Sequence, residues 1–557
     1  MAKKKQESKG ASKRKKLPEK YNKLLKVGVY DDTHRKQLQQ RAKRVQQLYR
    51  QAVDKIARAA APSLFDADPA KEFHFSDFPA LNKSVDEFID DMGKQLQANI
   101  EDGDSDAWTL ANAKNDMVVN TLASVYSIPK DTLKAWRHPH LDALQQFEER
   151  RKNGINLSNG GSAADPNNVR KGVWNLDQFK NELELALEQG IGKGKSAANL
   201  SRDVRQYLKY PDKLFRRVRD KDGVLRLSKA AASFHPGRGV YRSSYRNALR
   251  LTATENNIAY RTCDHLRWNS LPFVIGQEIK ISNNHTLHGK PFTDICDDLA
   301  GRYPKEFKFT GWHPFCRCYA VSILASEKEM DDYCRRIESG DGVNGYQFAG
   351  KVEDFPDKLK EWVKDNDSRI ASAFGRQKLP YFLADNPENL PKSIEKRIPH
   401  LSDMLRVKGN GDYKNVGFNI YTGAVRATHE GHNFDKKKGW YETAVQNAGF
   451  KEGHSVILEK EPQNVYGKRS TEGLWDGMRF EIAAAETNTH NNIRNALKHC
   501  ASKRDTEVAV VFFPNGVSIE DLRLGISKYN GLRNSGNGQW KQFKEMVFIS
   551  RGGIISQ

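Results

Sequence analysis

One segment, residues 283–322, most constrains what this chain can fold into, because it gathers side chains that bind soft or borderline metal ions. Its sequence is NNHTLHGKPFTDICDDLAGRYPKEFKFTGWHPFCRCYAVS. It holds three of the six cysteines and three of the fifteen histidines of the whole chain. Thiol and imidazole groups at this density indicate either a bound metal or a tightly packed loop.

Two interpretations of the segment remain open. Zinc takes four nitrogen or sulfur ligands in a tetrahedron, and the candidate ligands are His285, Cys296, His313, Cys316 and Cys318. In the other interpretation His313 and Pro314 set a turn, Arg317 pairs with a carboxylate, and the thiols are ordinary buried groups. Cys316 and Cys318 are closer in sequence than paired zinc ligands usually are, and an extended chain points them to opposite sides. The spacing favours a structural motif without zinc, and nothing marks one thiol as an activated nucleophile.

The charge of the chain is concentrated at its N-terminus. The formal net charge is +21, and residues 1–60 hold 19 Lys and Arg against 5 Asp and Glu, which leaves +14 there. Such a segment favours a phosphate backbone, but a solvated disordered tail has the same composition. No signal-peptide core follows the start, and no run of about 18 apolar residues occurs, so we expect no membrane segment and no secretion by a signal peptide. Few cysteines argue against a disulfide framework and fit a reducing compartment.

The length predicts three or four cores, since domains average roughly 150 residues. Apolar residues recur at helical spacing in several stretches, and residues 274–281 alternate as in a strand. The predicted helices are 36–60, 85–100, 107–126, 174–191, 196–208 and 241–261. Ser, Asn and Gly at residues 155–168 mark a boundary.

These patterns predict a multidomain α+β protein that is mostly helical in its N-terminal and central parts, with a small β region and a C-terminal α/β domain. The predicted segments are a basic tail (1–20), a helical region (21–160), a domain with the cysteine and histidine segment (170–325), a helical linker (326–412) and a C-terminal domain (415–557).

The end of the cysteine and histidine segment, GWHPFCRC at residues 311–318, resembles the HPxCRC ending of the phage Mu protein F-like head morphogenesis family. The preceding RLTATE at residues 250–255 resembles the R-T-E-type helix of the same family, and the resemblance covers roughly 174–324. Many members have a C-x-x-C pair before HPxCRC, whereas this chain offers His285, His288 and Cys296. The resemblance implies a minor head protein that contacts portal and major head proteins and phage DNA. It also implies a place in the virion, in the capsid interior or portal region, and in the host cytoplasm during assembly.

The C-terminal domain has a different pattern. A helix at 438–448, strands at 454–459 and 473–485, a helix at 491–500 and a strand at 507–513 give the order α-β-β-α-β. The hairpin DGMRFEIA at residues 476–483 resembles the D…(E)xK hairpin of PD-(D/E)xK nucleases. With NNIRNAL at residues 491–497, the domain resembles the tRNA nuclease domain of contact-dependent inhibition toxins. The resemblance implies that Glu442, Asp476 and Glu481 hold a divalent cation on the scissile phosphate of host RNA, with an immunity protein as a further partner.

Ala483 stands where the nuclease motif has lysine. Candidate groups for binding phosphate in its place are Lys460, Arg479, Arg494 and Lys498. His429 and His432 offer an alternative, metal-free acid and base catalysis through the 2′-hydroxyl of RNA. Three functions stay open: a minor head protein with a fused nuclease-like domain, a cytosolic nuclease with nucleic-acid-binding N-terminal helices, and a structural virion component with an inactive passenger domain.

Overall fold

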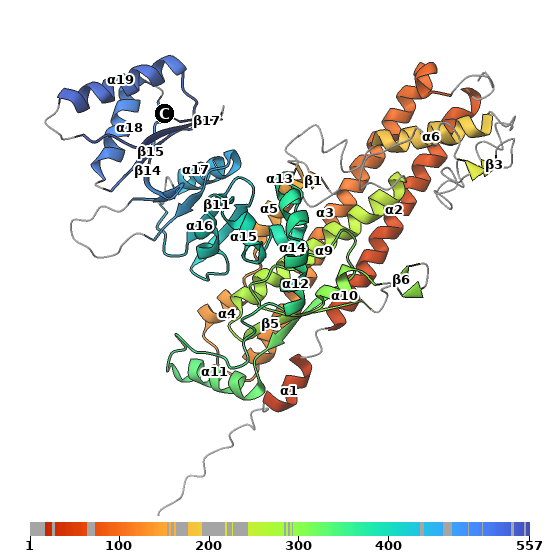
Figure 1. The fold of residues 1–557 in the computed structure, drawn as a ribbon, viewed down its shortest axis with the longest axis horizontal. Helices are drawn as coiled ribbons and strands as arrows, with labels where there is room; N and C mark the ends of the chain where they lie inside the picture. The colour runs from red at the N-terminus through yellow and green to blue at the C-terminus, as the bar shows by residue number, and fades with distance from the viewer. Residues whose placement is uncertain are drawn as a thin grey trace, which may run out of the picture. The chain divides into compact units, whose positions relative to one another are not determined.

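A computed structural model of the 557-residue chain is described here for residues 17–24, 28–63, 73–152, 155–156, 161–162, 176–191, 218–219, 225–226, 243–282, 286–287, 290–291, 293–434, 439–460, 471–487, 489–503, 505–535, 540–550 and 553–556 (Figure 1). The chain divides into two compact units, which we call unit 1 (residues 1–365 and 376–385) and unit 2 (residues 366–375 and 386–557). None of the described helices is long and apolar enough to cross a membrane. The basic tail before residue 17, the predicted helix at 196–208 and the candidate ligand His285 lie outside the described residues.

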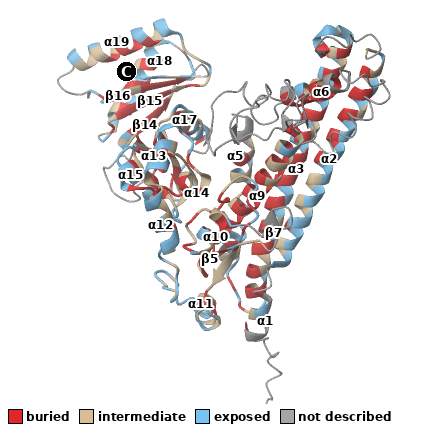
Figure 2. Cartoon of the chain, turned by 45° about the vertical axis from the view of Figure 1, so that its right-hand side comes forward, coloured by how far each residue is buried: buried red, intermediate tan, exposed pale blue. Residues whose placement is uncertain are grey.

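Unit 1 is built on three long helices that lie side by side, α2 (Gly28–Ser63), α3 (Pro79–Ala123) and α9 (Ser244–Ser270). Apolar residues at helical spacing give each helix one buried stripe, visible in red along their inner faces in Figure 2. One core joins α2, the first half of α3, and α6 (Leu176–Ile191), with Tyr49 edge-on to Phe179. Two helices from the predicted 21–160 segment therefore share a bundle with α9 from the predicted 170–325 segment.

Helix α3 is a single helix, although the sequence predicts two helices interrupted near residues 101–106. Gly103 lies inside it, and a Cβ atom there would stand 2.5 Å from Oδ1 of Asn256 on α9. The Asn256 amide donates to the carbonyl of Ile100 and to the carboxylate of Asp104. The polar and glycine-containing stretch is thus the close contact between two helices, and the helix continues through it.

A three-stranded antiparallel sheet follows α9, in the order β8 (Gly301–Tyr303), β5 (Val274–Lys280) and β9 (Tyr319–Leu324). Strand β5 confirms the predicted strand at 274–281. The further helices of unit 1 are α1 (Leu17–Leu24), η1 (Phe75–Asp77), α4 (Lys130–Trp136), α5 (Leu141–Lys152), α10 (Ile295–Leu299), α11 (Glu327–Ser339), α12 (Asp357–Asp365) and α14 (Tyr381–Ala384). Its two-residue strands are β1 (Ile155–Asn156), β2 (Gly161–Ser162), β3 (Val218–Arg219), β4 (Leu225–Arg226), β6 (Thr286–Leu287) and β7 (Lys290–Pro291).

Unit 2 is organised around an eight-stranded mixed sheet in which the spatial order follows the chain order. Its strands are β10 (Tyr413–Asn419), β11 (Ala424–His429), β12 (Val456–Leu458), β13 (Gly473–Trp475), β14 (Met478–Ala484), β15 (Val508–Phe513), β16 (Glu545–Ser550) and β17 (Gly553–Ser556). Its helices are α13 (Asp367–Gly375), η4 (Pro387–Asn389), α15 (Lys392–Glu395), α16 (Leu401–Val407), α17 (Gly439–Glu452), α18 (His490–Ser502) and α19 (Ile519–Ser535). The elements from α17 to β15 differ from the predicted α-β-β-α-β order by one strand, because the segment predicted as one strand at 473–485 folds into the hairpin of β13 and β14. Unit 2 also adds β10 and β11 before this series and α19, β16 and β17 after it.

The two faces of the large sheet carry separate cores. On one face Val445 of α17 packs with Trp475 and Phe480, and on the other Leu497 of α18 packs with Ala483, together with residues of α19. Because side chains alternate along a strand, neighbouring residues of β14 belong to different cores. This alternation turns Glu481 of β14 toward α18 and away from the α17 face.

Candidate active site

Three acid and base side chains of unit 2, His432, Glu442 and Glu472, converge on one point. Nε2 of His432 lies 2.7 Å from Oε2 of Glu442 and 3.8 Å from Oε2 of Glu472. The His432 side chain is fully buried, while the side chains of Glu442 and Glu472 are 10% and 18% exposed. One imidazole nitrogen and two carboxylates therefore meet at a largely buried point, where solvent reaches only the carboxylate side chains. We call this group the histidine–glutamate cluster.

Each member of the cluster is held by its local structure. His432 lies in the turn that follows β11. Glu442 lies in the first turn of α17, where the free N–H groups of the helix favour a carboxylate. Glu472 is fixed by the sheet, because its N–H donates to the carbonyl of Phe480 and its carbonyl accepts from the N–H of Glu459, both at 3.0 Å.

The hydrogen bonds of His432 determine what its ring can do. Nδ1 lies 2.8 Å from the carbonyl oxygen of Glu459, and because a carbonyl only accepts, Nδ1 carries a proton. Nε2 then faces the Glu442 carboxylate either as a second N–H donor or with a cation between them. Burial lowers the pKa of His432, but the hydrogen bond to Glu442 and the charges of Glu442 and Glu472 outweigh burial and raise the pKa above its ordinary value. A histidine whose Nδ1–H is held by a backbone carbonyl is in the orientation of a metal ligand.

A second layer of residues holds the carbonyl that orients His432. The carboxylate of Glu459 accepts from the hydroxyl of Tyr413 at 2.8 Å and pairs with the guanidinium of Arg406 at 3.0 Å. Phe434 packs edge-on to the His432 ring, with 4.8 Å between ring centroids. The imidazole is therefore fixed from two sides before any ligand binds.

Asp476, which the sequence predicts to join the site, lies at the opposite end of the hairpin from Glu472. Asp476 and Gly477 form the two-residue turn, with φ of 48° and 81°, the left-handed pair that such hairpins use. The Asp476 carboxylate accepts from the N–H of Ser455 and pairs with Nδ1 of His454, both at 2.7 Å. This hydrogen bond raises the pKa of His454. Asp476 thus ties the turn to the end of α17.

Glu481 lies on the other face of the sheet from the α17 core. Its Oε1 is 3.3 Å from Nε2 of His499 and 3.5 Å from Nζ of Lys503, and its Oε2 is buried without a hydrogen-bond partner among the described residues. The structure therefore does not bring Glu442, Asp476 and Glu481 together. Ala483 shares this face and packs in the α18 and α19 core.

Of the remaining predicted residues, His429 and Lys460 lie at the turn before His432, and the others lie elsewhere in unit 2. Nδ1 of His429 accepts from the N–H of Gly431, so this histidine holds the turn before His432. The alkyl chain of Lys460 packs against the same turn, since a Cβ atom on Gly431 would lie 3.0 Å from its Cγ. The other candidate cations lie elsewhere: the N–H of Arg479 donates to Glu507, the guanidinium of Arg494 bonds Asn495, and Nζ of Lys498 lies 4.8 Å above the Trp540 ring.

Sequence reasoning missed Glu472, and the hairpin register contains no signal for it. A two-residue turn at Asp476 and Gly477 pairs Gly473 with Phe480, and the ladder ends at that pair. Strict alternation along β13 would turn Glu472 away from the face of Trp475 and Phe480, which packs on α17. Glu472 lies just before the strand, and only the tertiary structure shows that its carboxylate meets His432 and Glu442.

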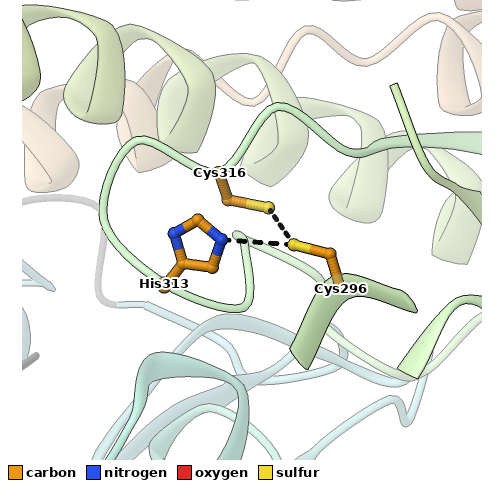
Figure 3. Close-up of side chains that lie close together, drawn as sticks. All are labelled: Cys296, His313 and Cys316. Atoms are coloured by element: carbon orange, nitrogen blue, oxygen red, sulfur yellow. Dashed lines mark hydrogen bonds between the residues drawn. The ribbon is translucent and has the colours of Figure 1, made fainter. Parts of the chain in front are cut away.

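The other group of candidate ligands, in unit 1, comes together only in part. Sγ of Cys296 lies 3.2 Å from Nε2 of His313 and 3.9 Å from Sγ of Cys316 (Figure 3). Cys318 is also buried, but it is not among the three residues whose ligand atoms all lie within 4.8 Å of one another. His285 lies outside the described residues. Arg317, expected to pair with a carboxylate, lies over the ring of Phe315, 5.2 Å from its centroid.

Comparison of the chain with models of known protein families, with curated proteins and with solved structures finds no match. Fold and geometry therefore define the class: unit 2 is an α/β unit with a buried histidine and two carboxylates suited to a divalent cation.

Proposed function

We propose that the chain is a minor head protein of a tailed phage and that unit 2 is a fused, divalent-cation-dependent ribonuclease. The proposal for unit 2 rests on the histidine–glutamate cluster, because three ligand atoms of the types that hold such a cation lie within 4.8 Å of one another. The proposal for the head protein rests on the family resemblance of the HPxCRC and RLTATE motifs.

The chemistry of the cluster follows from its ligands. His432, Glu442 and Glu472 would hold the cation, and a cation there polarises a phosphoryl oxygen and lowers the pKa of a bound water. Lys460, exposed beside the preceding turn, would offset the charge of the phosphate backbone. Arg406 and Tyr413 keep His432 oriented through Glu459.

The test of the nuclease uses the full-length chain with total tRNA and Mg²⁺, Mn²⁺ or Zn²⁺ in turn. We expect cleavage that requires a cation and that Glu442→Gln reduces by about a hundredfold or more. Glu452→Gln is the matched control, because Glu452 is an exposed carboxylate at the other end of the same helix. If His429→Ala abolished cleavage and Glu442→Gln did not, metal-free catalysis by the loop histidines would replace the proposal. If no cation supported cleavage, unit 2 would be an inactive passenger.

The head protein is tested separately, by mass spectrometry of purified particles from the phage that encodes the chain. We expect the chain in particles at a constant ratio to the portal protein. Its absence from particles, combined with cation-dependent cleavage of RNA, would favour the cytosolic nuclease.

A further inference from the structure

The loop at residues 311–318 of unit 1 has a conformation that brings separated polar groups to one point. Phe315 has a φ of 63°, which is uncommon for a residue with a side chain. The N–H of Cys316 donates to the carbonyl of His313 at 3.1 Å, so the turn places His313 and Cys316 side by side with two residues between them. A spacing of two residues is the usual one for paired zinc ligands. In the sequence the nearest cysteine to Cys316 is Cys318, with one residue between them, whereas the structure pairs Cys316 with His313.

The third side chain comes from a different element. Cys296 is in the first turn of α10, whose start is capped by Asp294. Figure 3 shows its sulfur pointing at both the His313 ring and the Cys316 sulfur. A zinc ion with Zn–S bonds of about 2.3 Å separates two sulfur ligands by about 3.8 Å. The observed Sγ–Sγ distance of 3.9 Å matches that separation and is far longer than a disulfide bond.

The surroundings supply a positive charge. Arg261 of α9 is 8% exposed, and its guanidinium donates to the carbonyl oxygens of Thr310, Cys316 and Cys318 at 2.5–3.0 Å. Within the part of the chain that the structure describes, these hydrogen bonds go to neutral groups only. A buried guanidinium without a negative partner is unfavourable. Three thiolates, one imidazole and Zn²⁺ together carry a charge of about −1, which would balance it.

We propose that unit 1 holds a structural zinc ion between Cys296, His313, Cys316 and Cys318. The sulfur atoms of Cys296 and Cys316 meet in the structure, all three cysteines are buried, and Cys318 would supply the fourth ligand from the same loop as Cys316. A site with four protein ligands leaves no position for substrate, so the zinc joins α10 to the loop before β9 and does no chemistry. The N–H of Phe315 also donates to Thr254 of α9, so the zinc loop is anchored on the bundle.

The experiment measures zinc in the full-length chain purified without chelators, and then the absorption spectrum after exchange for Co²⁺. We expect about one zinc per chain that survives Glu442→Gln, and a thiolate-to-cobalt charge-transfer band from three thiolates. Cys316→Ser and His313→Ala should lose the metal, while Cys334→Ser and Cys263→Ser, at buried free cysteines outside the group, should keep it.

Several outcomes would overturn the proposal. Wild-type chain without zinc and without a cobalt band would do so, and this measurement does not depend on a variant that folds. A band from two thiolates that Cys318→Ser leaves unchanged would remove Cys318 from the site and put Asp294, whose Oδ2 lies 3.5 Å from Nε2 of His313, in its place. Loss of RNA cleavage in Glu442→Gln with an intact cobalt band would instead support the proposal, because it separates this site from the proposed nuclease.

Discussion

The two clusters differ in their ligands and in what encloses them. In unit 1, buried thiols meet an imidazole whose side chain is 36% exposed, whereas in unit 2 a fully buried imidazole meets two carboxylates that are 10% and 18% exposed. Sulfur ligands suit a zinc site that stabilises a fold, and oxygen ligands suit a divalent cation that acts on phosphate. Similar convergence of three groups thus supports different roles, which depend on the type of ligand atom.

The largest expected effect is on the rate of RNA cleavage, and it should differ between Glu472 and Asp476, the acidic residues at the two ends of β13. We expect Glu472→Gln to reduce RNA cleavage by roughly a hundredfold or more, because it removes a cation ligand. Asp476→Asn should leave the rate within about threefold and lower the free energy of unfolding by about 1 kcal/mol, because it weakens the interactions with His454, Ser455 and His400 and touches no cation ligand. Initial rates of RNA cleavage measure the first quantity, and denaturant unfolding measures the free energy of unfolding. The reverse pattern would restore Asp476 to the active site.

The next largest effect should come from Arg261, whose guanidinium donates to carbonyl groups of the loop that holds the cysteines. Arg261→Met should lower the free energy of unfolding by roughly 3 kcal/mol, because it leaves three buried carbonyl groups without their donor. It should also accelerate zinc loss to a chelator. Arg317→Met is the control, since Arg317 is exposed in the same loop. Equal zinc loss from both variants would show that Arg261 does not balance a metal site.

Glu182 of α6 is a buried carboxyl that has no cationic partner among the described residues, and it sharpens the contrast with Glu442. Burial raises the pKa of Glu182 to about 8, although its carboxylate accepts from the N–H and hydroxyl of Ser244. Because the folded pKa exceeds the unfolded one, the stability contribution is lost as pH rises from about 4.5 to about 8. Glu182→Gln should therefore raise the melting temperature of the chain by on the order of 5 °C at about pH 9 and leave it nearly unchanged at about pH 4.

The control for this pH dependence is Glu184→Gln on the same helix. Glu184 is only partly buried and accepts from the N–H of Phe75. A melting temperature of Glu182→Gln that followed the wild type at every pH would show that Glu182 is ionised at no cost in the folded chain.

The smallest effect concerns the second layer around His432. Tyr413→Phe removes the hydroxyl that donates to Glu459 and should slow RNA cleavage about threefold to tenfold without changing the fold. Tyr529→Phe is the control, because its hydroxyl donates to the carbonyl of Lys541 on the α19 side of unit 2. Equal rates for both variants would mean that Glu459 keeps its position without Tyr413.

Much of the secondary structure of this chain follows from sequence periodicity. The long helix α2, strand β5, the Asp476 and Gly477 turn and the helix α18 lie where residue patterns predict them. The interruption expected near Gly103 does not occur, because a glycine that permits contact with Asn256 looks the same in sequence as one that ends a helix. Local patterns cannot distinguish these cases, since the difference lies in a partner about 150 residues away.

The sequence by itself determined which side chains were available: a concentration of cysteine and histidine in one segment, and acidic residues around a predicted hairpin. Only the tertiary structure decided which of them meet. Strand alternation turns Glu481 toward α18, while Glu472, just before β13 and outside its ladder, meets His432 and Glu442. The position of Arg261 over the cysteine loop depends on packing between α9 and residues some 50 positions later. Such contacts depend on register and packing between distant elements, and residue type and spacing do not encode them locally.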